Sequence, residues 1–574
     1  MLKFKHEFFL IIFVMLVSFM LFSSCSSSSS DQIENIVEEV VPADVEGQWE
    51  LSYKEVGKTE ETGPELLEIS QKGVSLTLTR YPAGAKPASS SGTVTAKDIF
   101  MTLAESGVHF KMSMIGKVAA DKTMSGTWTT IDGKHGTWDA VFNTLKPIVL
   151  INIGDSLTNG VQSGDHNVNE FTQLNSFTQL IANQMDQSAF LLWANPLLSV
   201  NGERKDWDII PYNLGVSGAT AKSLVEQKTN SGNDLMDKLL TPIPNLKGSE
   251  VSQIDAAEYI AGLYPGKQKV FTLWIGNNDV LGTVTAGGGT QITIDAINTF
   301  LSDTEAGHDI DSVLNNITIA VDRLKAIPDS HIFIGTLPNV TNIAFLFNEK
   351  DLERLAIFPN ADVVVLEPGQ SIGFGAFLNP VLPEQSIARA LASNNEILNA
   401  VIAGTIAASD GFSLSSEEAK LIDSRIDAIN AYIKNLADAN PTITLVDTNG
   451  ILKSVVKGEI VIGSETVTKT FGGGTFSLDG VHLSHTGYAF IANAFINAIN
   501  SALGLNISET DLNSIWAADP YHDHDGDGYV PGPKNTLTIS PAQTIINPML
   551  IPLSDCDDTN PDIVASYISG VPCQ

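Results

Sequence analysis

The 574-residue chain carries 66 acidic and 33 basic side chains, which gives a formal net charge of −33. So negative a surface repels phosphate backbones, and the composition therefore argues against nucleic acid as a partner. More than 500 residues follow the N-terminal segment, too many for one hydrophobic core, so two or three domains are expected.

Residues 1–25 have the composition of an export signal. Lys3 and Lys5 precede an uncharged apolar run, Phe8–Phe22, and small residues then lead to Cys25. The run is shorter than the ~20 residues that span a bilayer as a helix, although an uncleaved membrane anchor is the alternative. Cys25 resembles the lipidated cysteine of a bacterial lipoprotein, with Phe in place of the usual Leu three residues before it. That resemblance implies a lipid anchor in the bacterial cell envelope, at the periplasmic or surface face of the outer membrane, with 26–44 as a flexible tether.

Residues 45–145 have the pattern of a small all-β domain. Short alternating runs such as Val74–Thr79 and Trp138–Phe142 are separated by turns of Gly, Asp and Lys. No acid, base and nucleophile occur together here. Gly47-Gln48-Trp49 resembles the Gly-x-Trp opening of lipocalin-like barrels, and an accessory barrel or sandwich is expected.

Residues 146–505 alternate between predicted strands and helices. Ile148–Ile153 is a continuous run of mostly apolar residues, typical of a strand buried on both faces of a parallel sheet. Further strands are predicted at Trp207–Val216, Val270–Ile275, Ile332–Gly335 and Ile443–Val446, and helices at Phe177–Met185, Val313–Ile327, Glu384–Ile406, Ser416–Ala439 and Gly487–Leu503. This alternation predicts a three-layer α/β domain with a parallel sheet.

Four short segments of this domain carry candidate chemistry. The first predicted strand leads into Gly154-Asp155-Ser156-Leu157, and a nucleophilic serine needs such a rigid and accessible strand tip. Gly215-Val216-Ser217-Gly218 and Gly276-Asn277-Asn278-Asp279 follow at later strands, and Asp479-Gly480-Val481-His482 precedes the last helix. In order and context these segments resemble the conserved blocks of the SGNH hydrolases, also called the GDSL esterase and lipase family. The resemblance covers roughly residues 147–503.

The resemblance implies a role for each candidate catalytic residue. Ser156 is the expected nucleophile, His482 the general base and then acid, and Asp479 the group that orients His482; Gly218 and Asn278 are the expected oxyanion-hole members. The chemistry agrees, because a serine hydroxyl is a weak nucleophile until a base such as histidine removes its proton. A carboxylate three residues before the histidine can share its helical turn and hold its tautomer. No metal or cofactor is expected in the reaction.

Two residues beside these segments need separate consideration. His485 also precedes the last helix, but it lacks a carboxylate three positions earlier and is expected at the rim of the site. Asn277 stands where many family members have Gly, so its side chain is expected to narrow the cleft. The aromatic and aliphatic residues of Ala344–Phe347, Ile372–Leu378 and Phe476 either line an acyl-chain pocket or form the core of their own insertion.

The sequence favours an ester hydrolase that acts on a small-molecule or lipid ester through an acyl-enzyme intermediate. A polysaccharide O-deacetylase, which would use the same residues, is the alternative enzyme. A non-catalytic lipoprotein that binds glycans or another surface is an alternative of a different class. The presence of Ser156, Asn278, Asp479 and His482 together argues against it.

Residues 506–574 form an acidic segment with a second candidate chemistry. Carboxylates in 523–529 occupy positions 1, 3 and 5 of an oxygen-rich loop with Gly at position 6, but Lys534 stands where an EF-hand has an acidic residue. With 555–561 the segment resembles the calcium-binding repeats of thrombospondin type 3, which implies the ligands Asp523, Asp525, Asp527, Tyr529, Asp555, Asp557 and Asp558. A solvated acidic tail is the alternative, and zinc at His522 and His524 is less favoured beside hard oxygen donors.

The cysteine count leaves one pair after Cys25 is assigned to lipid. Cys556 and Cys573 are an even pair in an oxidising compartment, so a disulfide is preferred over two free thiols. The thrombospondin-like resemblance also implies that these two cysteines pair.

Overall fold

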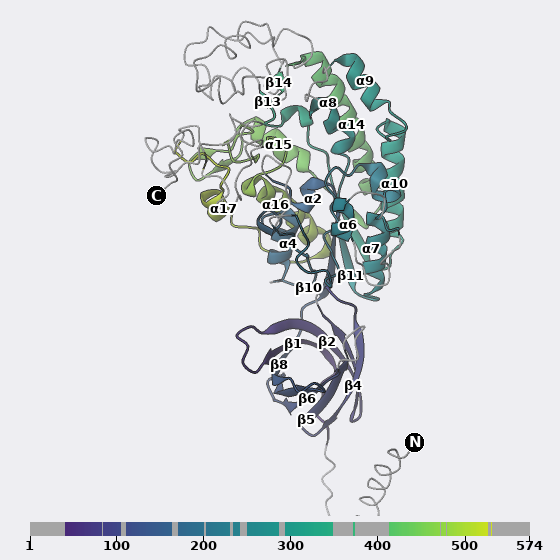
Figure 1. Cartoon of the computed structure of the whole chain (residues 1–574), viewed down its shortest axis with the longest axis vertical. Coiled ribbons are helices and arrows are strands. Elements are labelled where there is room, and N and C mark those ends of the chain that lie inside the picture. The colour runs from purple at the N-terminus through teal and green to yellow at the C-terminus, as the bar shows by residue number, and fades with distance from the viewer. Residues whose placement is uncertain are drawn as a thin grey trace, which may run out of the picture.

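The computed structural model describes residues 41–82, 84–104, 111–162, 170–186, 188–199, 202–229, 234–240, 250–285, 293–347, 371–373, 413–470, 472–477, 479–525 and 530. Figure 1 shows a β-barrel in purple and blue, with a larger α/β domain in teal, green and yellow above it. No helix of these described residues is both long enough and apolar enough to cross a membrane.

The barrel is closed and antiparallel, so the prediction of an all-β domain is confirmed. Its strands follow chain order and β1 pairs with both β2 and β8. Alternate side chains point inward: Trp49, Met114 and Trp138 are fully or almost fully buried in the centre. The strands are β1 (Gly47–Glu55), β2 (Thr62–Lys72), β3 (Ser75–Tyr81), β4 (Ala88–Thr95), β5 (Asp98–Ala104), β6 (Lys111–Val118), β7 (Thr123–Thr130) and β8 (His135–Asn143).

A five-stranded parallel sheet forms the centre of the α/β domain, in the order β10-β9-β11-β12-β16. These strands are β9 (Pro147–Gly154), β10 (Phe190–Leu192), β11 (Gln268–Trp274), β12 (Ser330–Gly335) and β16 (Ile443–Val446). Every residue of β9 is buried, and its side chains alternate between two hydrophobic clusters, with Ile151 in one and Leu150 in the other. The parallel sheet buried on both faces is therefore confirmed.

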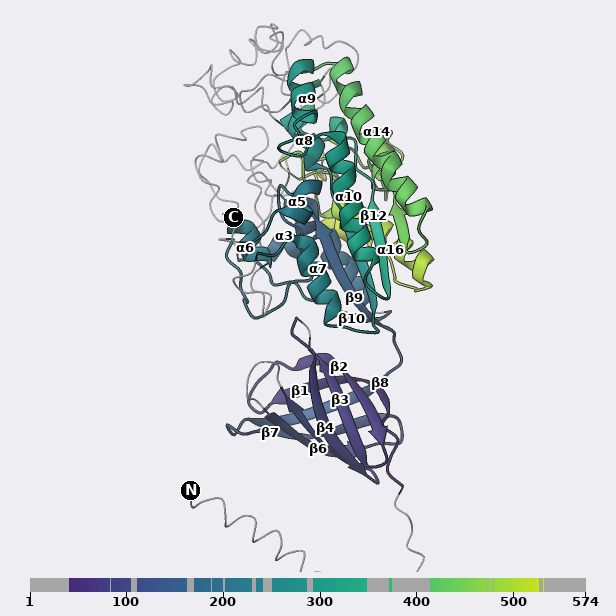
Figure 2. The ribbon, with the colours of Figure 1, turned by 90° about the vertical axis from the view of Figure 1, so that its right-hand side faces the viewer.

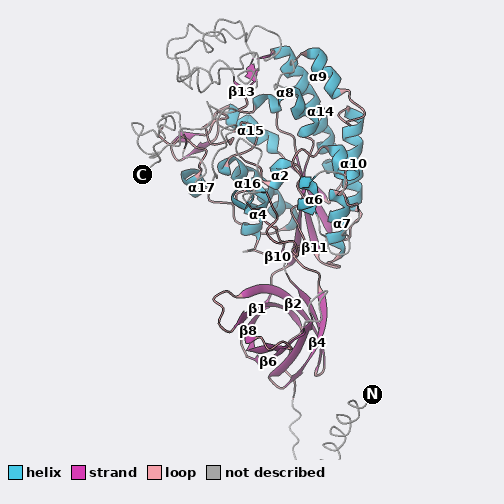
Figure 3. Cartoon of the chain, viewed as in Figure 1, coloured by secondary structure: helices cyan, strands magenta, loops and turns pink. Residues whose placement is uncertain are grey.

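Helices cover both faces of this sheet, as Figures 2 and 3 show. One face carries α5 (Ala221–Glu226), α7 (Gln253–Gly262), α10 (Ile310–Lys325) and α14 (Ser416–Asp438), and the other carries α4 (Phe177–Met185) and α16 (His485–Leu503). The helices predicted around α4, α10, α14 and α16 are confirmed. Ser415 and Glu418 form a capping box at the start of α14. The helix predicted at Glu384–Ile406 lies outside the described residues.

Shorter elements complete the domain. These are α2 (Ser156–Asn159), α3 (Glu170–Leu174), α6 (Asp234–Leu240), α8 (Asn278–Thr285), α9 (Ile294–Leu301), η1 (Val340–Asn342), β13 (Leu346–Phe347), β14 (Ser371–Gly373), β15 (Ser413–Leu414), α15 (Thr448–Val456), β17 (Val461–Ile462), β18 (Glu465–Thr466) and α17 (Leu512–Ala518). The helix α17 packs against α16, because Trp516 joins Phe490 and Val467 in a separate hydrophobic cluster.

The strand predicted at Trp207–Val216 is wrong, because the segment forms only an isolated bridge to β9. Its backbone follows the second half of β9: the Leu214 N–H donates to Asn152 O at 2.8 Å and the Val216 N–H to Gly154 O at 3.1 Å. The Asn213 side chain donates to Thr158 O at 2.9 Å, and its oxygen accepts the Gly215 N–H at 3.1 Å. These hydrogen bonds of the Asn213 side chain bend the backbone towards α2, whereas the backbone of a regular strand would continue straight. The first half of β9 pairs instead with β10, which the sequence did not predict.

The barrel contacts the α/β domain at the amino ends of the sheet strands. Tyr81 of β3 stacks on Tyr264 with ring centroids 5.9 Å apart, and the Ile210 N–H donates to Gly84 O at 2.7 Å. Glu68 of β2 forms an ion pair with Lys267, directly before β11. The barrel therefore lies at the end of the sheet opposite the carboxyl ends of its strands.

Candidate active site

Ser156 lies at the carboxyl end of β9, on the first turn of the short helix α2. The Asp155 side chain caps this helix by accepting the Leu157 N–H at 3.0 Å. A Cβ atom at Gly154 would lie 2.2 Å from Thr158 Oγ1 and 2.4 Å from Trp274 O, so only glycine fits where the strand passes into the helix. The serine is therefore held on a tightly packed turn.

Ser156, His482 and Asp479 form one continuous chain of hydrogen-bonding contacts. The distance from Ser156 Oγ to His482 Nε2 is 2.8 Å, and that from His482 Nδ1 to Asp479 Oδ2 is 2.6 Å. All three residues are buried. Since the Asp479 carboxylate accepts the Nδ1 proton, Nε2 is left with a lone pair that faces the serine hydroxyl. The arrangement can therefore remove a proton from Ser156.

Asp479 and His482 lie in a loop before α16, so the expectation that they share a helical turn is wrong. The Asp479 Oδ1 atom accepts the N–H groups of Val481 at 2.9 Å and of His482 at 2.8 Å, which closes a side-chain turn. Burial by itself raises the pKa of Asp479, but the His482 ring and these two N–H groups outweigh it and lower the pKa below its ordinary value. The carboxylate is thus held in its charged form beside the imidazole.

Gly218 follows the segment that is hydrogen-bonded to β9, and Asn278 follows the neighbouring strand β11. Gly218 has a left-handed backbone, with φ of +78°, and a Cβ atom there would meet no atom within 4 Å. Asn278 begins α8 and lines the same pocket as Ser156 and His482. Its Nδ2 atom donates to Ala219 O at 2.9 Å, which places the loop after Gly218 beside this amide. The structure thus brings the four predicted segments together.

Asp155, Asn277 and Asp279 are buried polar residues beside the nucleophile whose contacts the sequence did not predict. The Asn277 Nδ2 atom donates to Asp155 Oδ2 at 2.8 Å, and Asp279 Oδ2 accepts the Ala221 N–H at 2.9 Å. Burial raises the pKa of Asp155 to about 6. Burial, with the added charge of Asp155, raises the pKa of Asp279 to about 7. The sequence feature that could have indicated this contact is Asn277, which stands where many family members have Gly. Its side chain donates to Asp155 and also lines the pocket.

The pocket beside Ser156 is lined mostly by apolar side chains. Phe476 is among them and also belongs to the main core cluster. Ala344 and Leu346 belong to that cluster without lining the pocket, and Phe374–Leu378 lies outside the described residues. The apolar lining residues are Leu157, Trp274, Leu281, Pro338, Val340, Ile343, Ile451, Leu452, Val455, Phe476, Val481, Leu483, Phe490 and Ile491. Such a lining suits a hydrocarbon chain far better than a polar group.

His485 contacts the C-terminal segment, so its expected place at the rim of the site is wrong. It is the first residue of α16, and its ring meets that of Tyr521 edge-on at 5.7 Å. Burial lowers the pKa of His485, and the nearby Asp519 carboxylate opposes this effect. Among the described residues that line the pocket, His482 is the histidine.

Other predicted functional residues fall partly or wholly outside the described structure. Of the expected calcium ligands, Asp523 and Asp525 are described. The remaining ligands Asp527, Tyr529, Asp555, Asp557 and Asp558, the cysteines Cys556 and Cys573, and the lipidation site Cys25 lie outside the described residues.

Comparisons with known proteins place this site in a family. The sequence model of the GDSL-like Lipase/Acylhydrolase family matches residues 150–495, which is more than half of the chain and contains all five predicted catalytic residues. No curated protein sequence matches the chain significantly.

Three solved structures resemble parts of the chain at low sequence identity. An extracellular lipase from Streptomyces rimosus is 13% identical, with 62% of this chain and 99% of the lipase covered and a TM-score of 0.29. A carbohydrate esterase is 11% identical, with 50% and 79% covered and a TM-score of 0.17. A redesigned β-barrel is 13% identical, with 17% and 90% covered and a TM-score of 0.16. On the family match, the chain belongs to the GDSL-like lipase/acylhydrolase family of hydrolases.

Proposed function

We propose that the protein hydrolyses carboxylic esters through an acyl-enzyme on Ser156. The observation that carries the proposal is the contact chain from Ser156 Oγ through His482 to Asp479, with distances of 2.8 and 2.6 Å. In this geometry His482 Nε2 accepts the hydroxyl proton as Oγ attacks the ester carbonyl carbon. Asp479 then stabilises the imidazolium ion that forms.

The negative charge that develops on the carbonyl oxygen requires preorganised donors. We assign this role to the backbone N–H groups of Ser156 and Gly218 and to the amide of Asn278. One Asn278 hydrogen is used by Ala219 O, and the second is available to the oxyanion. Each such donor commonly contributes ~3 kcal/mol to transition-state stabilisation.

Collapse of the tetrahedral intermediate completes the first half of the reaction. The C–O bond to the leaving alcohol breaks, and His482 gives its proton to that alcohol, which leaves the acyl group on Ser156. Water then attacks the acyl carbon while His482 accepts its proton. The carboxylic acid departs and the serine hydroxyl is restored.

The lining of the pocket supports an apolar acyl group as the part of the ester that binds beside Ser156. Each buried CH₂ group of an acyl chain gains about 0.8 kcal/mol on leaving water, so a longer chain binds more tightly as far as the pocket extends. An acetyl group would leave most of the apolar lining in contact with water. The pocket therefore favours an esterase or lipase over an O-deacetylase.

Replacement of the nucleophile tests the reaction. Ser156→Ala should keep the fold and reduce turnover of p-nitrophenyl esters by about three orders of magnitude or more. Ser424→Ala, on the exposed face of α14, is the matched control and should retain full activity. Retention of a tenth of wild-type turnover by Ser156→Ala would exclude the serine mechanism.

A change in the pocket tests the substrate class. Ile451→Trp, at a half-buried lining position, should raise KM for octanoate or decanoate esters at least about tenfold and change acetate hydrolysis little. Val456→Trp, on the exposed side of the same helix, is the matched control. A wild-type enzyme that prefers acetate over every longer chain would support the O-deacetylase.

We also propose roles for the parts of the chain outside the hydrolase domain. The closed barrel and the buried Trp49 support a lipocalin-like accessory domain, since Gly47-Gln48-Trp49 opens its first strand. The sequence of 1–25 supports an envelope lipoprotein anchored through Cys25. The acidic clusters at 523–529 and 555–558 support calcium binding in the C-terminal segment.

A further inference from the structure

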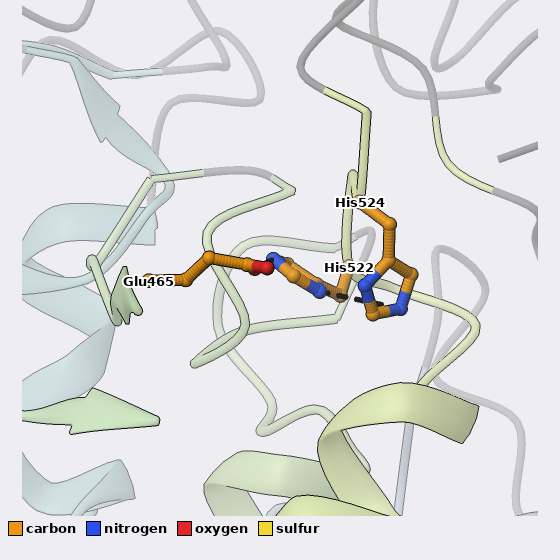
Figure 4. Close-up of side chains that lie close together, drawn as sticks. All are labelled: Glu465, His522 and His524. Carbon is orange, nitrogen blue, oxygen red and sulfur yellow. Dashed lines mark hydrogen bonds and ion pairs between the residues drawn. The ribbon is translucent and has the colours of Figure 1, made fainter. Parts of the chain in front are cut away.

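We propose that Glu465, His522 and His524 form a binding site for one zinc-class divalent cation, separate from the catalytic site. Glu465 belongs to β18, and the two histidines follow α17, so distant parts of the chain supply the ligands. One ligand atom from each of the three residues can be chosen such that all lie within 4.8 Å of one another. Figure 4 shows the His522 ring between the Glu465 carboxylate and the His524 ring.

The distance between the two histidines suits a tetrahedral ion. His522 Nδ1 lies 3.3 Å from His524 Nε2, and His522 Nε2 lies 3.4 Å from Glu465 Oε2. Two ligands bound to zinc at ~2.05 Å in tetrahedral geometry lie about 3.3 Å apart. An imidazole binds a given ion through one nitrogen, so the third ligand must turn towards the other two. The Glu465 side chain is 48% exposed, so it can turn once its Oε2 atom releases the Trp516 indole N–H.

The kind of ligand selects the kind of ion. Two imidazole nitrogens and one carboxylate are a common ligand set for Zn²⁺ and for its first-row neighbours, whereas Ca²⁺ and Mg²⁺ prefer oxygen ligands alone. With three protein ligands, water would occupy the fourth position of a tetrahedral zinc ion. The ligand set thus favours zinc at His522 and His524, the choice that the sequence alone made the less favoured one.

Neighbouring groups position His522, and Trp516 contacts both His522 and Glu465. The Trp516 indole N–H donates to Glu465 Oε2 at 3.1 Å, and the His522 ring packs on the Trp516 ring with centroids 3.6 Å apart. The His522 N–H donates to Asp519 O at 3.2 Å, and the side chain is nearly fully buried. Such outer groups orient metal ligands before the ion arrives.

The ion would link the segment after α17, which carries the two histidines, to β18 of the hydrolase domain, which carries Glu465. His522 forms an isolated bridge with Gly472, and the Asp523 N–H donates to Gly472 O at 3.1 Å. A few residues further on, Thr475 lines the pocket, and its carbonyl accepts the Ser484 N–H at 3.0 Å. The cation would therefore stabilise the packing beside the loop that carries His482.

Asp523 lies between the two histidines in the sequence. A Cβ atom at Gly472 would lie 2.9 Å from that of Asp523, whereas the ring nitrogens of His522 and His524 meet at 3.3 Å. Asp523 is therefore not one of the three residues that form the zinc-class site.

Metal titration of the purified full chain tests the proposal. After removal of metal with a chelator, wild-type protein should bind one Zn²⁺ by calorimetry and retain it through dialysis, as measured by mass spectrometry. Glu465→Gln and His524→Gln should each weaken this site at least about tenfold. Glu459→Gln and His135→Gln, at exposed positions, are matched controls and should bind zinc as the wild type does.

Three further measurements make the test decisive. Far-UV circular dichroism and esterase turnover establish that the variants fold. Co²⁺ should give wild-type protein the visible absorption of a tetrahedral site, and both ligand variants should lose it. Excess Ca²⁺ should not displace the zinc. Equal zinc affinity in wild type and in a Glu465→Gln, His524→Gln double variant would overturn the proposal, as would stoichiometric displacement by Ca²⁺.

Discussion

Replacing Asp279 with asparagine should stabilise the hydrolase domain in alkaline solution. The Asp279 side chain is buried, and its pKa is raised from 3.8 to about 7, chiefly by burial. An acid whose pKa is raised by folding binds more protons in the folded state than in the unfolded state between these two values. Stability is therefore lost as the pH rises from about 4 to about 7, and the loss is complete above that range. Asparagine has no such charge, and its oxygen can still accept the Ala221 N–H.

The size of the effect follows from the pKa difference. Raising the pKa by about 3 destabilises the folded state by roughly 4 kcal/mol once Asp279 is ionised in both the folded and the unfolded state. At about pH 5 the unfolded state is ionised and the folded state is not, so the destabilisation is roughly 1 to 2 kcal/mol. Asp279→Asn should therefore gain about 2 to 3 kcal/mol over the wild type between about pH 5 and about pH 8.5.

Urea unfolding at both pH values measures this gain. Loss of esterase turnover reports the hydrolase domain, and circular dichroism reports the whole chain. Asp427→Asn removes one exposed carboxylate from α14 and should show no such change with pH. An Asp279→Asn variant whose stability relative to the wild type is constant between the two pH values would refute the reasoning, and so would one that loses stability at the higher pH.

The other predictions concern the proton relay, the anchor and calcium. His482→Ala should reduce kcat about as much as Ser156→Ala, whereas His485→Ala should be mild; the reverse order would make His485 the base. Asp479→Asn should cost less than His482→Ala, because an amide still positions the ring in part, and equal losses would show that the charge is essential. Cys25→Ser should abolish incorporation of labelled fatty acid and release the protein from membranes; continued association would indicate an uncleaved apolar anchor. Calcium at about a hundredfold excess over Kd should add ~2.7 kcal/mol to the C-terminal segment, measured as slower proteolysis with turnover unchanged.

The parts of the fold that the sequence predicted are those in which burial leaves a local pattern. Strand β9 is apolar at nearly every position because both of its faces are covered, and α14 begins at a capping box that can be read in four residues. Strand β10 has only three residues, too few for a period to show. The bend at Asn213 depends on its bond to Thr158 O, which no local pattern reveals.

The candidate site also contains parts that the sequence predicted and parts that it did not. Its four segments could be recognised because each holds its residues close together in the sequence. The contact between Asn277 and Asp155 could not be recognised, because the two residues are brought together only by the pairing of β9 with β11. The meeting of Glu465 with His522 depends equally on tertiary packing, since a hairpin and a segment after α17 must fold against each other.

The position of the barrel has a consequence for the reach of the enzyme. The chain enters the barrel near Ala43, whose N–H donates to Ala96 O in the β4–β5 turn. The contacts of Tyr81 and Gly84 with the hydrolase domain lie elsewhere on the barrel, and Ser156 lies at the far end of the sheet beyond them. In a molecule held at Cys25, the expected tether 26–44 and the whole barrel would thus separate the point of attachment from the hydrolase domain, and the pocket would open at the end of that domain away from the barrel.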